Sequence, residues 1–160
     1  MKKNTRFWNI LFCLYGALML TLLFGRIRME GDVPYWQQVW ANMNLRPFHT
    51  IGNFMDVLLR KEYYLEKWGS ALVYAGQARL AIINLGGNVA MFVPLGFFLP
   101  KVSPRLRKLW RTLLATTLII LLVEMLQLFS LRGICDVDDV ILNVLGAAIG
   151  YCVYKIFHRK

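Results

Sequence analysis

The sequence predicts an all-α integral membrane protein: a four-helix bundle, with short interfacial helices in the long outer segment between the first two spans. Hydrophobic residues make up 58% of the 160-residue chain, against roughly 45–50% in a soluble domain. They gather into four long runs, and a soluble protein of this size has too little polar surface to cover four such helices. We therefore expect residues 1–160 to form a single membrane domain.

The four runs define the predicted transmembrane helices. At about 1.5 Å per helical residue, each run crosses most of a hydrocarbon core of roughly 30 Å. The predicted spans are residues 7–24, 81–100, 112–129 and 140–156. Because no A-x-A-like cleavage motif follows the first run, we expect an uncleaved anchor and not a signal peptide.

The outer segment, residues 25–80, is expected to lie close to the membrane surface. Its aromatic rings suit the headgroup zone, where they meet both water and lipid. These residues are Tyr35, Trp36, Trp40, Tyr63, Tyr64, Trp68 and Tyr74. Pro47 favours an extended conformation at Arg46, and Gly52-Asn53 predicts a break before a short amphipathic run over residues 54–59.

The charges of the connecting segments predict the orientation. The N-terminal tail, the connection at residues 101–111 and the C-terminal end hold eleven basic residues and no acidic one. Residues 25–80 and 130–139 hold eight of each sign. Since basic residues are retained in the cytoplasm, both termini are predicted to be cytoplasmic. Topology and anionic lipid explain the basic connection, so no nucleic-acid partner is predicted.

Polar residues of three spans are predicted to share one depth in the outer half of the bilayer. Glu124 lies about five residues, or ~7.5 Å, from the outer end of its helix. A carboxylate in hydrocarbon costs at least ~2.5 kcal/mol unless it faces protein or water. Side chains at a similar depth are Asn84 and Asn88 on the second span, Gln127 on the third, and Asp139 and Asn143 on the fourth. We therefore expect one polar pocket that opens to the outside.

A structural interpretation of the same residues stays open. Asparagine and glutamine hydrogen-bond between membrane helices for roughly 0.6–2 kcal/mol each. The spacing Gly146-x-x-x-Gly150 is typical of a close-packing helix face. This interpretation is weakest for Glu124, since packing does not require an ionisable group where glutamine would serve.

Three aspartates precede the last span, at Asp136, Asp138 and Asp139. Asp138 or Asp139 could cap that helix by accepting hydrogen bonds from its free N–H groups. Three neighbouring acids also repel one another, and an arginine such as Arg132 or Arg46 could relieve this. A hard divalent ion is the other possibility, but the spacing matches no complete EF-hand loop. We predict neither a metal site nor a cofactor.

The three cysteines form no C-x-x-C pattern, so no disulfide framework or cysteine metal site is predicted. Cys13 and Cys152 lie within spans, where cysteine serves as a small apolar residue. Cys135 lies in the outer loop and is the candidate for a reactive thiol on that side of the membrane.

Several polar positions resemble the motifs of one family of bacterial membrane proteins. The matching stretches are Leu45-Arg46-Pro47-Phe48, residues 88–97 (NVAMFVPLGF), Glu124-x-x-Gln127, and Asp136-x-x-Asp139 followed by Asn143 and Gly146. In order and spacing they resemble the VanZ-like family. The founding member is associated with teicoplanin resistance, and the family's molecular activity is unassigned, so the resemblance implies no catalytic residue. It does imply that seven residues occupy motif positions: Arg46, Asn88, Glu124, Gln127, Asp136, Asp139 and Asn143.

Two hypotheses from different functional classes follow. In the first, the protein contributes to glycopeptide (teicoplanin) resistance by altering the outer surface or antibiotic access through the polar pocket. Arg46 or Arg132 would then hold an anionic headgroup, and the acidic residues a cationic or hydroxylated group. In the second, a membrane enzyme acts on a lipid-linked cell-wall intermediate, with Glu124 as the candidate general acid or base.

The first hypothesis is favoured, because the sequence offers no Ser-His-Asp or Cys-His set. His49 lies in the outer segment, whereas His158 is predicted on the cytoplasmic side. The expected partners are the lipid bilayer and a lipid-linked cell-wall precursor or lipoglycopeptide. The candidate ligand-binding residues are Arg46, Asn88, Glu124, Gln127, Arg132, Asp136, Asp139 and Asn143.

Overall fold

The computed structural model describes residues 2–25 and 31–158, so residues 26–30 of the predicted outer segment lie outside the described ranges. Within those ranges the fold is helical, as predicted. The α-helices are α1 (Lys2–Phe24), α2 (Tyr35–Ala41), α3 (His49–Leu59), α4 (Lys61–Trp68), α5 (Ala71–Val102), α6 (Leu109–Phe129) and α7 (Val137–Phe157). Four of them, α1, α5, α6 and α7, are long and apolar enough to cross a membrane.

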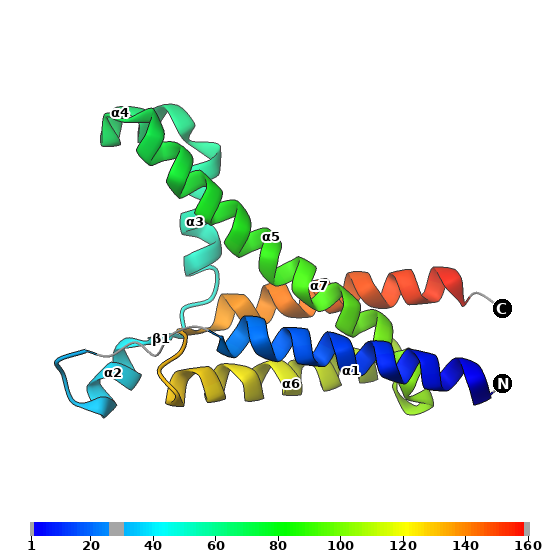
Figure 1. The fold of residues 1–160 in the computed structure, drawn as a ribbon. Coiled ribbons are helices and arrows are strands. Elements are labelled where there is room, and N and C mark those ends of the chain that lie inside the picture. Colours follow the sequence, from blue (N-terminus) through cyan, green and yellow to red (C-terminus); the bar gives the residue numbers. More distant parts are fainter. Residues whose placement is uncertain (1, 26–30, 159–160) are drawn as a thin grey trace.

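Helix α5 differs most from its predicted span. It begins at Ala71 and not near residue 81, because Ser70 caps it by accepting a hydrogen bond from the Val73 N–H. Gln77 and Arg79 lower the hydropathy of this first part, but both are good helix formers. With 32 residues, α5 is about 48 Å long. Figure 1 shows it running diagonally across the other spans, so that its first half extends beyond them.

Close backbone contact joins α5 to α7. An added Cβ at Gly146 or Gly150 of α7 would overlap the carbonyl oxygen of Val89 or Val93 of α5. From the other side, a Cβ at Gly96 would overlap the Ala147 carbonyl. The predicted close-packing face of α7 therefore has its partner within the same chain.

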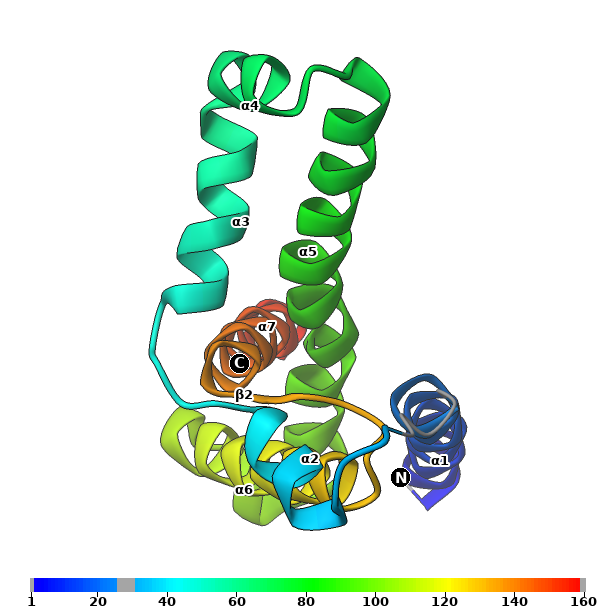
Figure 2. The same cartoon turned by 90° about the vertical axis from the view of Figure 1, so that its left-hand side faces the viewer.

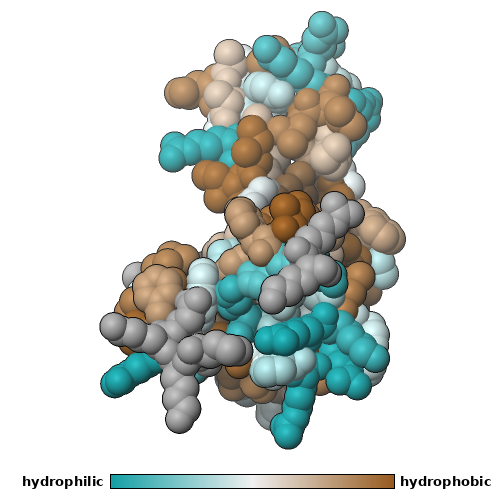
Figure 3. Space-filling view, turned by 90° about the vertical axis from the view of Figure 1, so that its right-hand side faces the viewer, coloured by the Kyte–Doolittle hydropathy of each residue, from teal (hydrophilic) through white to brown (hydrophobic). Residues whose placement is uncertain are grey.

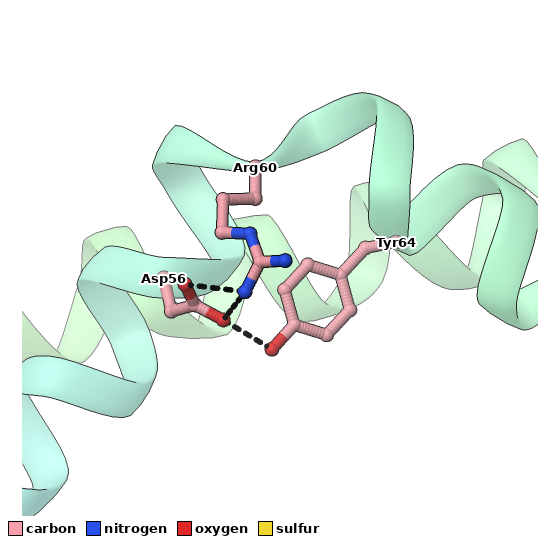
Figure 4. Close-up of polar contacts among 3 residues, drawn as sticks. All are labelled: Asp56, Arg60 and Tyr64. Carbon is pink, nitrogen blue, oxygen red and sulfur yellow. Dashed lines mark hydrogen bonds and ion pairs between the residues drawn. The ribbon is translucent and has the colours of Figure 1, made fainter.

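Helices α3 and α4 fold back along the first half of α5 and form an arm with it (Figure 2). The predicted break at Gly52-Asn53 is wrong, since both residues lie inside α3. A polar contact joins α3 to α4: Asp56 accepts a 2.8 Å hydrogen bond from the Tyr64 hydroxyl and pairs with Arg60 at 3.4 Å (Figure 4). The Tyr64 hydrogen bond, with the Arg60 charge, holds the pKa of Asp56 below its ordinary value.

Two short strands connect the outer segment to the start of α7. β1 (Met43–Asn44) and β2 (Cys135–Asp136) pair in parallel, with Asn44 opposite Asp136. The sequence analysis did not predict this pairing. Both ends of the chain lie at the opposite end of the bundle (Figure 1), and hydrophilic side chains gather on that end (Figure 3).

Candidate functional site

Two adjoining cavities lie at the end of the bundle that carries the strands. We call the first the inner chamber; it has a volume of about 260 Å³. Its polar lining comes from three helices: Asn84 and Asn88 of α5, Glu124 and Gln127 of α6, and Asp139 and Asn143 of α7. Leu22 and Leu23 of α1 complete one wall.

The second cavity, the outer chamber, has a volume of about 630 Å³. The arm lines it with His49, Thr50, Asn53 and Phe54 of α3. Asn44, Arg132, Asp136 and Asp139 contribute further polar groups. Asn84, Asn88, Gly133, Ile134 and Asp139 line both chambers, so the two cavities adjoin.

The acidic side chains of α6 and α7, Glu124 and Asp139, line the same inner chamber. Glu124 is only 5% exposed, and Asn143 is 4% exposed. Asp139 accepts a short hydrogen bond from the Asn88 side-chain amide, which ties α7 to α5. The Oδ1 atom of Asn143 accepts no hydrogen bond from the part of the chain that the structure describes.

Two predicted site residues also hold the end of α1. The Gln127 side-chain amide donates a 2.8 Å hydrogen bond to the Leu23 carbonyl. Arg132 donates a 2.6 Å hydrogen bond to the Phe24 carbonyl. These carbonyls belong to the last turn of a helix, where they lack intrahelical partners. Gln127 and Arg132 therefore satisfy the end of α1 while they line the chambers.

The aspartate that caps α7 is not one of the two that were predicted to do so. Asp136, and not Asp138 or Asp139, caps α7, since its Oδ1 accepts a 2.9 Å hydrogen bond from the Asp138 N–H. Its Oδ2 accepts hydrogen bonds from the side chains of Thr50, at 2.5 Å, and Asn44, at 3.0 Å. Asp136 therefore connects α7, α3 and β1.

Asp138 caps the neighbouring helix α3. Its carboxylate accepts hydrogen bonds from the N–H groups of Phe48, Thr50 and Ile51, at 2.5, 2.8 and 3.0 Å. The free N–H groups at the start of a helix are a favourable site for a negative charge. Asp138 is completely buried, so its position fixes where the arm begins.

Arg46 is exposed and lines neither chamber. The arm contributes residues that the sequence analysis did not select, of which His49 is the ionisable one. Asn53 stands one turn after His49 on the same face of α3, 3.5 Å from its ring nitrogen. The spacing His49-x-x-x-Asn53 was the available signal, but it indicates no ligand without the rest of the chamber.

No group of three or more His, Cys, Asp or Glu side chains in the described ranges is arranged to hold a metal ion. Cys135 lies beside the chambers in β2 and is partly buried. Burial raises the pKa of its thiol, and the negative charges of Glu124, Asp136 and Asp139 add to the increase. The thiol is therefore mostly protonated at neutral pH.

Comparison with protein families identifies the family of this chain. The model of the family described as VanZ/LLP1 matches residues 12–158, which is nearly the whole chain. Comparisons with curated proteins and with solved structures gave no match. The family match agrees with the resemblance of the polar motifs, and the four apolar helices make the protein a multi-pass membrane protein. The chain belongs to the VanZ/LLP1 family.

Proposed function

We propose that the protein binds the polar headgroup of an envelope amphiphile in the two chambers. By doing so it would alter the outer surface or antibiotic access and contribute to resistance to teicoplanin. One observation carries the proposal: α3, α5, α6 and α7 place polar side chains around two adjoining cavities at one end of the bundle. Ligand sites commonly combine such a polar cluster with apolar walls. A lipid-linked cell-wall precursor or the lipoglycopeptide itself is the expected partner.

The proposal includes the orientation of the protein in the cell membrane. Both termini lie at one end of the bundle (Figure 1). The basic connection between α5 and α6, with Arg105, Arg107 and Lys108, lies close to that end. Because basic residues are retained on the cytoplasmic side, we place the termini in the cytoplasm. The chambers and the arm then face outward.

A thiol-labelling experiment tests this orientation. A membrane-impermeant maleimide applied to intact cells is expected to label Cys135, because Cys13 and Cys152 lie within spans. Only the thiolate reacts, and the pKa of Cys135 is raised. Labelling should therefore be slow at neutral pH and increase about tenfold per pH unit while the pH stays below that pKa. Cys135→Ser is the control, and labelling that requires permeabilised cells would place the chambers in the cytoplasm.

A chamber-filling substitution tests the function. Gly87 lines the inner chamber, and a Cβ at this position would meet nothing within 4 Å. Gly87→Phe is therefore expected to fill the chamber without disturbing the helix backbone. Teicoplanin susceptibility of cells that depend on this protein should return to the level of cells without it.

Gly86→Phe is the matched control for that experiment. Gly86 is the preceding residue of α5, is exposed, and also has nothing within 4 Å of an added Cβ. It does not line either chamber, so resistance should persist. Membrane levels of both variants are compared by immunoblot. If Gly87→Phe protects as well as the unchanged protein, the chambers are not the functional site.

An enzymatic role is the second candidate, and the burial of Glu124 beside Asp139 in one chamber favours it. Glu124 would act as general acid or base on a lipid-linked cell-wall intermediate. The two candidates differ in their products. An enzyme changes the mass of a lipid intermediate, which mass spectrometry of envelope extracts detects, whereas a binding protein leaves every intermediate unchanged.

A further inference from the structure

We propose that the inner chamber binds the protonated amine of an amphiphile. This inference rests on the proposed headgroup-binding function and specifies the chemistry of the headgroup. Acidic residues can bind either a cation or a neutral hydroxylated group. The inference is that the headgroup bound here is a cation. Four observations carry it: the charge of the lining, an unpartnered acceptor, the apolar walls and the place where the chamber meets lipid.

The ionisable groups that line the inner chamber are acidic. They are Glu124 and Asp139, and the described lining contains no lysine, arginine or histidine. Arg132 and His49 line the outer chamber instead. Buried carboxylates are stable when a positive charge or hydrogen-bond donors compensate them. A cationic ligand adds the positive charge that no described lining residue supplies, whereas a hydroxyl group adds a donor and no charge.

The second observation is the free acceptor of Asn143. This residue is 4% exposed, and its Oδ1 accepts no hydrogen bond from the described residues. Buried acceptors are usually satisfied, so one that lines a cavity indicates a donor from a ligand or from water. A primary ammonium group has three N–H donors and no acceptor. It can therefore donate to the Oδ1 atom of Asn143 and keep two N–H groups for other acceptors of the lining.

The third observation is the apolar wall of the chamber. Its apolar lining residues are Leu22, Leu23, Ile83, Met91, Phe92, Val123 and Ile134. The volume of about 260 Å³ exceeds what a single ion or water molecule occupies, since a water molecule takes about 30 Å³. An apolar chain attached to the amine would fill the rest of the space and remove these side chains from water.

The fourth observation is that the chamber reaches the lipid-facing surface between α1 and α5. Leu22 of α1 is 51% exposed and Ile83 of α5 is 55% exposed, although both line the chamber. The ring contacts that join α1 to α5 lie toward the other end of the bundle, for example between Trp8 and Phe97. Figure 1 shows α5 running away from α1 toward the arm. A membrane amphiphile can therefore enter from the bilayer with its polar end toward Glu124.

The test uses the full-length protein in nanodiscs of phosphatidylcholine, whose headgroup has no N–H donor. Octylamine, which is cationic at neutral pH, is titrated by calorimetry and compared with its neutral analogue N-acetyloctylamine. We expect octylamine to bind and N-acetyloctylamine to bind at least about tenfold more weakly, because a hydrogen bond to a charged group accounts for such a factor. Equal binding of the two compounds, or binding of neither, would overturn the inference.

Variants locate the amine. Glu124→Gln keeps the volume and removes the charge, so octylamine affinity should fall about tenfold or more. Glu62→Gln makes the same change at an exposed position of α4, and it should leave the affinity unchanged. Unaltered affinity in Glu124→Gln would place the amine elsewhere. If Glu124→Gln does not fold, the comparison of octylamine with its acetylated analogue in the unchanged protein still decides.

A second set of nanodiscs separates the two sources of the amine. Phosphatidylethanolamine, added to the bilayer, should reduce octylamine binding if the ligand is a lipid headgroup. Octylamine binding that is unaffected assigns the site to a free amphiphilic amine. The Gly87→Phe experiment fails separately: a resistance effect without amine binding overturns only this inference, and amine binding without a resistance effect overturns only the proposed contribution to resistance.

Discussion

Replacing Gly150 by alanine is expected to lower the free energy of unfolding by about 3 kcal/mol. The added methyl group would overlap the carbonyl oxygen of Val93 and lie 2.9 Å from its carbonyl carbon and 3.0 Å from the Phe97 nitrogen. All three atoms belong to the backbone of α5, so no side-chain rotation can relieve the overlap. Helices α5 and α7 must separate along their main contact, and the neighbouring contacts at Gly146 and Gly96 weaken with them.

Gly86→Ala is the matched control for Gly150→Ala, because it adds the same methyl group where nothing lies within 4 Å. Alanine is favoured over glycine in a helix by about 1 kcal/mol, so this variant should be at least as stable as the unchanged protein. Unfolding in mixed micelles with increasing sodium dodecyl sulfate measures both. Equal stability of Gly150→Ala and Gly86→Ala would mean that α5 and α7 do not meet at these glycines.

The spans could be predicted from the sequence because hydropathy is a local property. Each run of apolar residues requires lipid or protein around it wherever it lies in the fold. The stripe of Asp139, Asn143, Gly146 and Gly150 is also local, since the helical period alone places these residues on one face. Which helix packs against that stripe cannot be read from the neighbouring sequence. Glycines on both α5 and α7 allow close packing, and only the fold shows that they face each other.

The first part of α5 shows where hydropathy fails. Arg79 and Gln77 interrupt the apolar run without interrupting the helix, so the predicted span began near residue 81. The added turns of α5 belong to the arm. The α3 helix of the arm lines the outer chamber with His49, Thr50 and Asn53. A segment that was predicted to be interfacial therefore supplies one wall of the candidate site.

The role of the aspartates could not be assigned from spacing alone. The predicted cap of the last span by Asp138 or Asp139 was wrong, since Asp136 caps α7 and Asp138 caps α3, a helix about ninety residues earlier in the chain. The pairing of β1 with β2 brings these distant segments together. Arg46 is a motif residue that follows β1 closely in the chain, but it lines neither chamber.

Asp138→Ala is therefore expected to release the arm, with a loss of about 3 kcal/mol or more in the free energy of unfolding. The substitution removes the buried carboxylate that accepts hydrogen bonds from the N–H groups of Phe48, Thr50 and Ile51, which are partly buried contacts. Each buried N–H group without a partner costs about 1–3 kcal/mol. Asp138→Asn keeps one oxygen acceptor, so its loss should be smaller.

Hydrogen exchange distinguishes release of the arm from general unfolding. In Asp138→Ala the amides of residues 48–59 should exchange much faster, whereas those in the middle of α7 should stay protected, because Asp136 caps α7 from the preceding turn. Asp32→Ala removes a carboxylate at an exposed position and should change neither region. Faster exchange along α7 would show that Asp138 supports its own helix. With α3 released, the outer chamber loses the wall that holds His49 and Asn53, so the same carboxylate that fixes the arm also determines whether the chamber exists.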